Sequence, residues 1–195
     1  MRSDQESYLH TLSVTQMANA PISRRQLFRG DLRGNRTPLR PPWAVPATVF
    51  TVACDRCGDC ARACPEKIIR VADGGFPVVD FAVGGCSFCG ECLSACGGKA
   101  LRGDLQNDRP WAVVARIGSG CLAYRGVVCR SCGEACDEGA IRYRLRVGGA
   151  AEPTLIPDSC TGCGYCVMVC PVQALKTEAS AGPQAAIAEQ ENRTA

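Results

Sequence analysis

Three groups of four cysteines, each spaced C-x2-C-x2-C-x3-C, constrain the fold of this chain more than any other feature. They are Cys54, Cys57, Cys60 and Cys64 (set one), Cys86, Cys89, Cys92 and Cys96 (set two), and Cys160, Cys163, Cys166 and Cys170 (set four). Cysteines at intervals of three wrap one loop around three corners of a cubane 4Fe-4S cluster, and the fourth points away from that loop. The spacing therefore predicts three 4Fe-4S sites.

The fourth cysteine of such a set ligates the other cluster in two-cluster ferredoxins. By that logic the first half of the chain holds two mixed ligand sets. They are Cys54, Cys57, Cys60 and Cys96 for one cluster, and Cys86, Cys89, Cys92 and Cys64 for the other. The spacing alone does not decide between this exchange and four ligands from a single set.

A further group departs from the pattern and reads C-x7-C-x2-C-x3-C. Its members are Cys121, Cys129, Cys132 and Cys136 (set three). Gly126 stands where the first cysteine would be, yet Cys121 follows Trp111 at nearly the distance at which Cys54 follows Trp43. We interpret the extra residues as a longer loop that lets Cys121 reach a fourth cluster. The alternative is an incomplete ligand shell, and three clusters in all.

The cysteine region is an internal repeat. A short similar segment follows each set (PEKII, GGKAL, DEGAI and PVQAL), and it brings one apolar residue five positions after the last cysteine. These residues are Ile69, Leu101, Ile141 and Leu175. The sequence thus predicts an α+β fold of two tandem bacterial 2×(4Fe-4S) ferredoxin-like modules, 38–105 and 106–178. A polar, basic segment (1–37) precedes them, and a tail predicted to be disordered (179–195) follows.

Secondary structure is expected to be short. Residues 111–117 and 141–147 have the pattern of strands. Residues 76–81 and 153–156 are the candidate partner strands. Helical turns are expected within three of the cysteine sets, at 59–64, 91–96 and 165–170. Trp43 and Trp111 repeat with the modules and are expected to cap their cores. Phe88, Tyr124 and Tyr165 lie in cysteine loops and are expected to shield clusters from water.

Composition narrows the class of protein. The 195 residues include 16 cysteines, a share typical of disulfide scaffolds or metal proteins. Zinc prefers two separated C-x2-C pairs and disulfides need an oxidising compartment, so both fit the packed loops less well. The net charge of +3 counts every thiol as neutral. Because an oxidised cluster with four thiolates carries about −2, that charge does not indicate nucleic-acid binding. The sequence contains no apolar run of roughly 18 residues, so no membrane span is predicted.

No pattern indicates substrate chemistry. His10 is the only histidine and has no partner motif, and no glycine-rich phosphate loop follows a strand. We therefore expect neither an enzyme nor a small-molecule site.

A twin-arginine pair stands in the segment ISRRQLFRG, where an export signal would have it. Such a signal needs a following apolar stretch, but charged residues follow Phe28, so export is not predicted. Ser23 and Gln26 instead form a capping box, which predicts a short helix near 24–29. We interpret it as a partner-docking element that uses Arg24, Arg25, Leu27 and Phe28. The alternative is a solvated basic lead-in whose apolar residues pack on the cluster domain.

The order SRRQLFRG, RPPW and three regular cysteine sets interrupted by CLAYRGVVCRSCGEACDEGAI resembles the NapF family, from about Ser23 to Thr177. These are ferredoxin-type accessory proteins of periplasmic nitrate reductase systems. The resemblance implies a cytoplasmic iron–sulfur protein that binds the catalytic subunit, a NapA-like precursor, and assists its maturation before export. The other function considered is an electron-transfer polyferredoxin subunit between redox enzymes.

Overall fold

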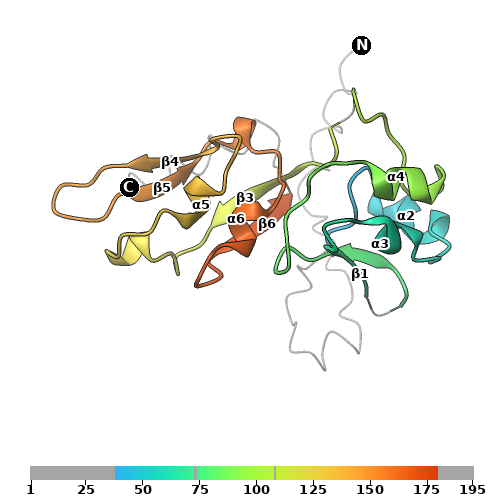
Figure 1. Ribbon diagram of the computed structural model, residues 1–195, viewed down its shortest axis with the longest axis horizontal. Coiled ribbons are helices and arrows are strands. Elements are labelled where there is room, and N and C mark those ends of the chain that lie inside the picture. The colour runs from blue at the N-terminus through green and yellow to red at the C-terminus, as the bar shows by residue number, and fades with distance from the viewer. Residues whose placement is uncertain (1–37, 73, 108, 180–195) are drawn as a thin grey trace, which may run out of the picture. The chain divides into compact units, whose positions relative to one another are not determined.

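A computed structural model of the chain describes residues 38–72, 74–107 and 109–179 (Figure 1). All described residues belong to one unit of the chain, Pro38–Ala195. The expected helix near 24–29, with Arg24, Arg25, Leu27 and Phe28, lies outside the described residues and stays a prediction. So does the tail beyond Ala179.

The described elements are short, and they mix helix and strand as expected. The helices are α2 (Ala47–Ala53), α3 (Asp59–Ala63), α4 (Glu91–Cys96), α5 (Ser131–Glu134) and α6 (Tyr165–Met168), with 3-10 turns η1 (Ala123–Arg125) and η2 (Pro157–Ser159). The strands are β1 (Ile69–Val71), β2 (Pro77–Val79), β3 (Val113–Ile117), β4 (Ile141–Arg144), β5 (Glu152–Leu155) and β6 (Leu175–Ala179). None of these helices has the length and apolar character needed to cross a membrane.

The strands form three antiparallel pairs, β1–β2, β3–β6 and β4–β5. The β4–β5 pair, with Ile141 opposite Leu155, joins two of the expected strand segments, 141–147 and 153–156. The partner of β2 is β1, and the partner of β3 is β6, with Ile117 opposite Leu175. Neither β1 nor β6 was expected from the sequence.

The internal repeat is visible in the pairing of β3 with β6. At the matching place in the first half, Ala44 after Trp43 forms an isolated antiparallel bridge with Leu101. This pairing stops early because Pro46, two residues further on, has no N–H to donate and is the N-cap of α2. Each half thus has an antiparallel pairing between its beginning and its end. In the second half it is the β3–β6 strand pair, and in the first half it is a single bridge.

The core consists of two hydrophobic clusters. The first is built on Trp43, Phe50, Ile68, Ile69, Phe81 and Leu101, and the second on Val114, Ala115, Ile141 and Leu175, each together with cysteines. All four apolar residues that follow the sets are buried. Cysteine side chains therefore form part of the interior itself.

Trp111 was expected to cap the core of the second module, but it does not belong to the second hydrophobic cluster, so this expectation was wrong. Its ring packs with the first cluster and lies edge-on to Phe81 at 5.8 Å and to Phe88 at 5.9 Å between ring centroids. The reason is that the repeat copies the position of the tryptophan but not its neighbours. Both phenylalanines come from the first half of the chain.

Candidate metal centres

Left-handed backbone conformations curl each regular cysteine loop. The residue before the second cysteine has a positive φ in all three regular sets: Arg56 (63°), Phe88 (54°) and Gly162 (77°). A left-handed glycine follows the second cysteine in each of them, at Gly58, Gly90 and Gly164. Two such residues within four positions turn the chain sharply, and the three thiols of a loop then face a common space.

Three pockets are each lined by four cysteines drawn from two sets. Their cysteine linings are Cys64 with Cys86, Cys89 and Cys92 (site two), Cys170 with Cys121, Cys129 and Cys132 (site three), and Cys136 with Cys160, Cys163 and Cys166 (site four). In each, the fourth cysteine of one set joins the first three of its partner set.

Site one consists of the remaining four cysteines. Burial raises the pKa of the Cys60 thiol to about 11, and the next contributions come from Cys96 and Cys54. Cys96, the last residue of set two, thus lies with the loop of set one. Cys54, Cys57 and Cys96 thus all lie close enough to Cys60 to raise the pKa of its thiol, as the first expected mixed set requires.

Comparison with known proteins identifies the chemistry of these sites. Residues 53–100 match the family model of a 4Fe-4S dicluster domain, and residues 153–176 match that of a 4Fe-4S binding domain. Set three lies outside both matches. These two matches identify the chain as a 4Fe-4S protein.

Two relatives identify the family. The ferredoxin-type protein NapF of Haemophilus influenzae is 40% identical over 164 residues, which cover 79% of this chain and 92% of that protein. The ferredoxin-type protein NapF of Escherichia coli K12 is 37% identical over 156 residues, covering 80% and 94%. The chain belongs to the NapF family of ferredoxin-type proteins. The ferredoxin-type protein NapG of Escherichia coli K12 is also similar, with 32% identity over 158 residues that cover 71% of this chain and 68% of that protein.

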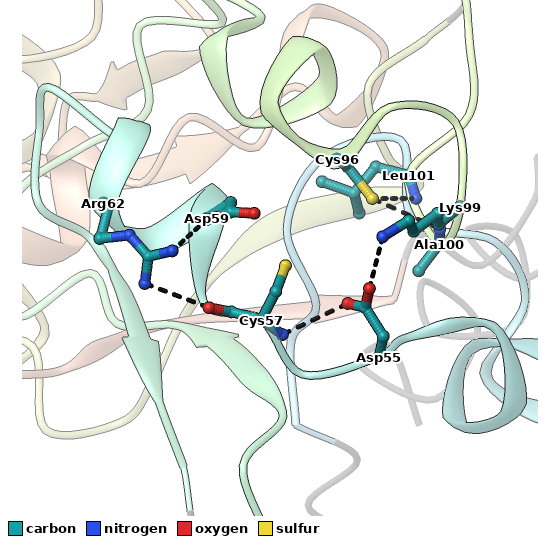
Figure 2. A network of polar contacts seen from close by, with 8 residues as sticks. All are labelled: Asp55, Cys57, Asp59, Arg62, Cys96, Lys99, Ala100 and Leu101. Atoms are coloured by element: carbon teal, nitrogen blue, oxygen red, sulfur yellow. Dashed lines mark hydrogen bonds and ion pairs between the residues drawn. The ribbon is translucent and has the colours of Figure 1, made fainter.

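The donor set of this NapF family member fits a cluster, because backbone N–H groups point at the cysteine sulfurs. The N–H groups of Ala100 and Leu101 donate to Cys96 Sγ over 3.4 and 3.3 Å (Figure 2). The same bond recurs at the same spacing in the second half, from Ala140 to Cys136 (3.3 Å) and from Ala174 to Cys170 (3.2 Å). Donors of this kind stabilise the thiolate that a cluster requires.

A surface network ties the loop of set one to the end of set two, as Figure 2 shows. The Asp55 carboxylate accepts the N–H of Cys57 over 3.3 Å and pairs with Lys99. The hydrogen bond from Lys99 lowers the pKa of Asp55 to about 2, so the carboxylate is ionised at neutral pH. Arg62 pairs with Asp59 and donates to the Cys57 carbonyl over 3.1 Å. The network holds the chain on either side of site one, although its exposed charges are screened by water.

Buried thiols in these sites hold their protons tightly in the absence of metal. Burial, the largest cause, raises the pKa of Cys86 to about 11 and those of Cys92 and Cys166 to about 12. All sixteen cysteines are free thiols, and none forms a disulfide. Cluster binding must therefore displace protons from groups that are neutral at physiological pH.

The longer loop of set three folds back so that Cys121 lines site three. The Leu122 carbonyl accepts the N–H groups of both Arg125 and Val127 over 3.0 Å, and Gly126 between them has a φ of 83°. The extra residues are thereby taken up in the turn η1. Cys121 itself is buried beside Cys132.

Sequence reasoning missed one residue of this site, Tyr143 on β4. Its hydroxyl lies 3.4 Å from Cys132 Sγ and accepts the N–H of Gly133 over 3.2 Å. The two residues meet only because β4 packs against α5, and no local sequence pattern predicts that contact.

Proposed function

We propose that this chain holds four 4Fe-4S clusters in crosswise ligand sets. The observation that carries the proposal is that the last cysteine of sets one, three and four lines the space of its partner set, and that Cys96 of set two lies near Cys60 of set one. The ligands are Cys54, Cys57, Cys60 and Cys96 (site one), Cys64, Cys86, Cys89 and Cys92 (site two), Cys121, Cys129, Cys132 and Cys170 (site three), and Cys136, Cys160, Cys163 and Cys166 (site four). When bound, such clusters accept and release single electrons.

Iron content of the anaerobically purified protein tests this number. Roughly 16 irons per chain are expected, and a value of about 12 would reject the role of Cys121. The variant Cys121→Ser should lose roughly four irons, and a Ser94→Ala control, which changes no cysteine, should lose none.

The protein is further proposed to act in the cytoplasm on the precursor of the catalytic subunit of periplasmic nitrate reductase. There it would assist maturation before export. Support comes from membership of the NapF family and from the basic segment ISRRQLFRG, whose Arg24, Arg25, Leu27 and Phe28 would meet the partner. A plain electron carrier has no evident need of such a segment.

A pull-down with the reductase precursor tests the docking role. The variant in which these four residues are alanine should bind less than the intact protein, while its iron content stays the same. Equal capture by both proteins would contradict docking through this segment. Cell fractionation of the tagged full-length protein checks the compartment, and a periplasmic pool would contradict the cytoplasmic assignment.

A second candidate function is electron transfer between redox enzymes. It is favoured by the direct contact between the cysteine loops of set two and set four, where the backbone N–H of Cys86 donates to the Cys163 carbonyl. Electron delivery to a purified acceptor enzyme, undiminished in the alanine variant of the basic segment, would support this function over docking and maturation.

A further inference from the structure

Site three contains a side-chain contact with no counterpart in the repeat. The Tyr143 hydroxyl lies 3.4 Å from Cys132 Sγ, and the N–H of Gly133 donates to the same hydroxyl over 3.2 Å. Because the phenol oxygen already accepts the N–H of Gly133, its own proton is free to point at the sulfur. A ligand thiolate can only accept, so the hydroxyl is the donor whenever a cluster is bound.

The local sequence of set three makes room for this contact. Gly133 follows the third cysteine of its set, where the other sets have Ala61, Leu93 and Val167. A Cβ on Gly133 would collide with the Tyr143 ring, so only glycine lets the ring approach. Seven positions after the fourth cysteine, where set three has Tyr143, the other sets have Val71, Gly103 and Thr177. Among the four sets, only set three has both the tyrosine and the space for it.

Two neighbouring groups hold the tyrosine in place. The Arg130 guanidinium lies over its ring, 5.0 Å from the centroid. On β4, Tyr143 pairs with Pro153 of β5, so its backbone position is fixed by the hairpin. Set three has a second, longer hydroxyl–sulfur contact, between Ser131 and Cys129 at 3.9 Å.

We infer that Tyr143 is a tuning residue that raises the reduction potential of the cluster at site three. A hydrogen bond to a ligand sulfur stabilises the reduced cluster, which carries one more negative charge, more than the oxidised one. One electron from an external reductant converts the cluster from the 2+ to the 1+ state, and no bond forms or breaks. The inference rests on the ligand sets proposed above.

The test is a redox titration of the anaerobically purified full-length protein with dithionite, followed by electron paramagnetic resonance. Tyr143→Phe keeps the ring and removes the hydroxyl, so one cluster should shift to a lower midpoint potential while the other three stay unchanged. Gly133→Ala should shift the same cluster in the same direction, because it displaces the ring. Thr154→Val, which replaces an exposed hydroxyl of β5 with a methyl group, is the control and should shift none.

A spectroscopic signature separates tuning from a merely structural role. In the wild type, an exchangeable proton should couple magnetically to the site-three cluster and be replaced by deuterium in heavy water. Tyr143→Phe should lose this coupling. Unchanged potentials in Tyr143→Phe would overturn the inference, as would a loss of roughly four irons per chain, which would mean that the hydroxyl retains the cluster and does not tune it.

A further variant distinguishes a wrong assignment of the cluster ligands from a wrong role for Tyr143. Cys170→Ser should remove the cluster that Tyr143→Phe shifts. If it removes a different cluster, the crosswise assignment is wrong, whereas an absent shift with the correct cluster removed contradicts only the role of Tyr143.

Discussion

The backbone N–H of Cys86 donates to the carbonyl oxygen of Cys163 over 2.7 Å and joins the loop of set two to the loop of set four. Glycines on both sides permit this approach. A Cβ on Gly85 would lie only 2.5 Å from the Tyr165 ring, and one on Gly164 would collide with Phe81. Sites two and four are therefore neighbours across the boundary between the two halves of the chain.

A side chain at Gly85 should open this contact. In Gly85→Val the new methyl groups displace the Tyr165 ring, and the hydrogen bond from Cys86 to Cys163 is lost. We expect faster hydrogen exchange at the Cys86 amide, measured by mass spectrometry on the anaerobic protein, with iron content unchanged.

The matched control for that variant is Gly149→Ala, whose Cβ would meet nothing closer than 3.8 Å. It should leave exchange at Cys86 unaltered. The double variant Gly85→Val/Tyr165→Ala removes the clashing ring and should restore part of the protection. Wild-type exchange in Gly85→Val alone would show that the contact does not form in solution.

Crosswise ligation predicts which cysteine variants resemble one another. Cys57→Ser and Cys96→Ser come from different sets but should remove the same paramagnetic signal of the reduced protein, because both residues belong to site one. Cys89→Ser should remove another signal. If the spectrum of Cys96→Ser matches that of Cys89→Ser instead, each set closes on its own cluster.

Iron removal should unfold the second half of the chain before the first. Among the described residues, the buried side chains of the second hydrophobic cluster include no aromatic ring. Those of the first hydrophobic cluster include Trp43, Phe50 and Phe81. With little other apolar surface to bury, the second half depends more on its metal groups. Hydrogen exchange after anaerobic chelation should show β3 and β6 losing protection first. Simultaneous loss across both halves would contradict this order.

Trp43 offers a test at site two. Its indole nitrogen is buried without a hydrogen-bond partner among the described residues, and its side chain lines the space around Cys64 and Cys86. Since an unpaired buried N–H costs about 1–3 kcal/mol, a cluster sulfur is the expected acceptor. Trp43→Phe should therefore lower the midpoint potential of one cluster, and not the one that responds to Tyr143→Phe.

Trp111 provides the control for that experiment. Its indole nitrogen donates to the Thr161 carbonyl over 3.1 Å, so Trp111→Phe should leave all potentials in place. If Trp43→Phe also shifts none, its N–H does not reach the cluster.

Local features of the fold were predictable from the sequence. The helical turns within sets one, two and four, the β4–β5 pair and the burial of Ile69, Leu101, Ile141 and Leu175 all follow from short-range patterns. Three of these residues, Ile69, Ile141 and Leu175, follow the same tight turn after the fourth cysteine, whereas Leu101 follows the left-handed Gly97 and Gly98. In the second half, for example, the N–H of Gly139 bonds the Cys136 carbonyl and that of Gln173 bonds the Cys170 carbonyl.

Contacts between distant segments were not predictable in the same way. The strand β6 contains Lys176 and Glu178 and carries no strand signal of its own, and it becomes a strand only because β3 lies beside it. In the sequence, Tyr143 is likewise an ordinary residue of an alternating strand. Its close contact with Gly133 is apparent only in the structure. The expected exchange of fourth cysteines between sets is different, because the ligand pattern of two-cluster ferredoxins itself encodes a long-range contact.

The crosswise sets bear on the timing of biosynthesis. Cys54, Cys57 and Cys60 leave the ribosome well before Cys96, and Cys121, Cys129 and Cys132 well before Cys170. At roughly 5–20 residues per second, each early loop waits several seconds for its last ligand. With the ligand sets proposed above, a nascent chain cannot complete any cluster before the loop of set two has emerged as far as Cys92, and machinery that delivers clusters would have to recognise paired loops rather than single ones.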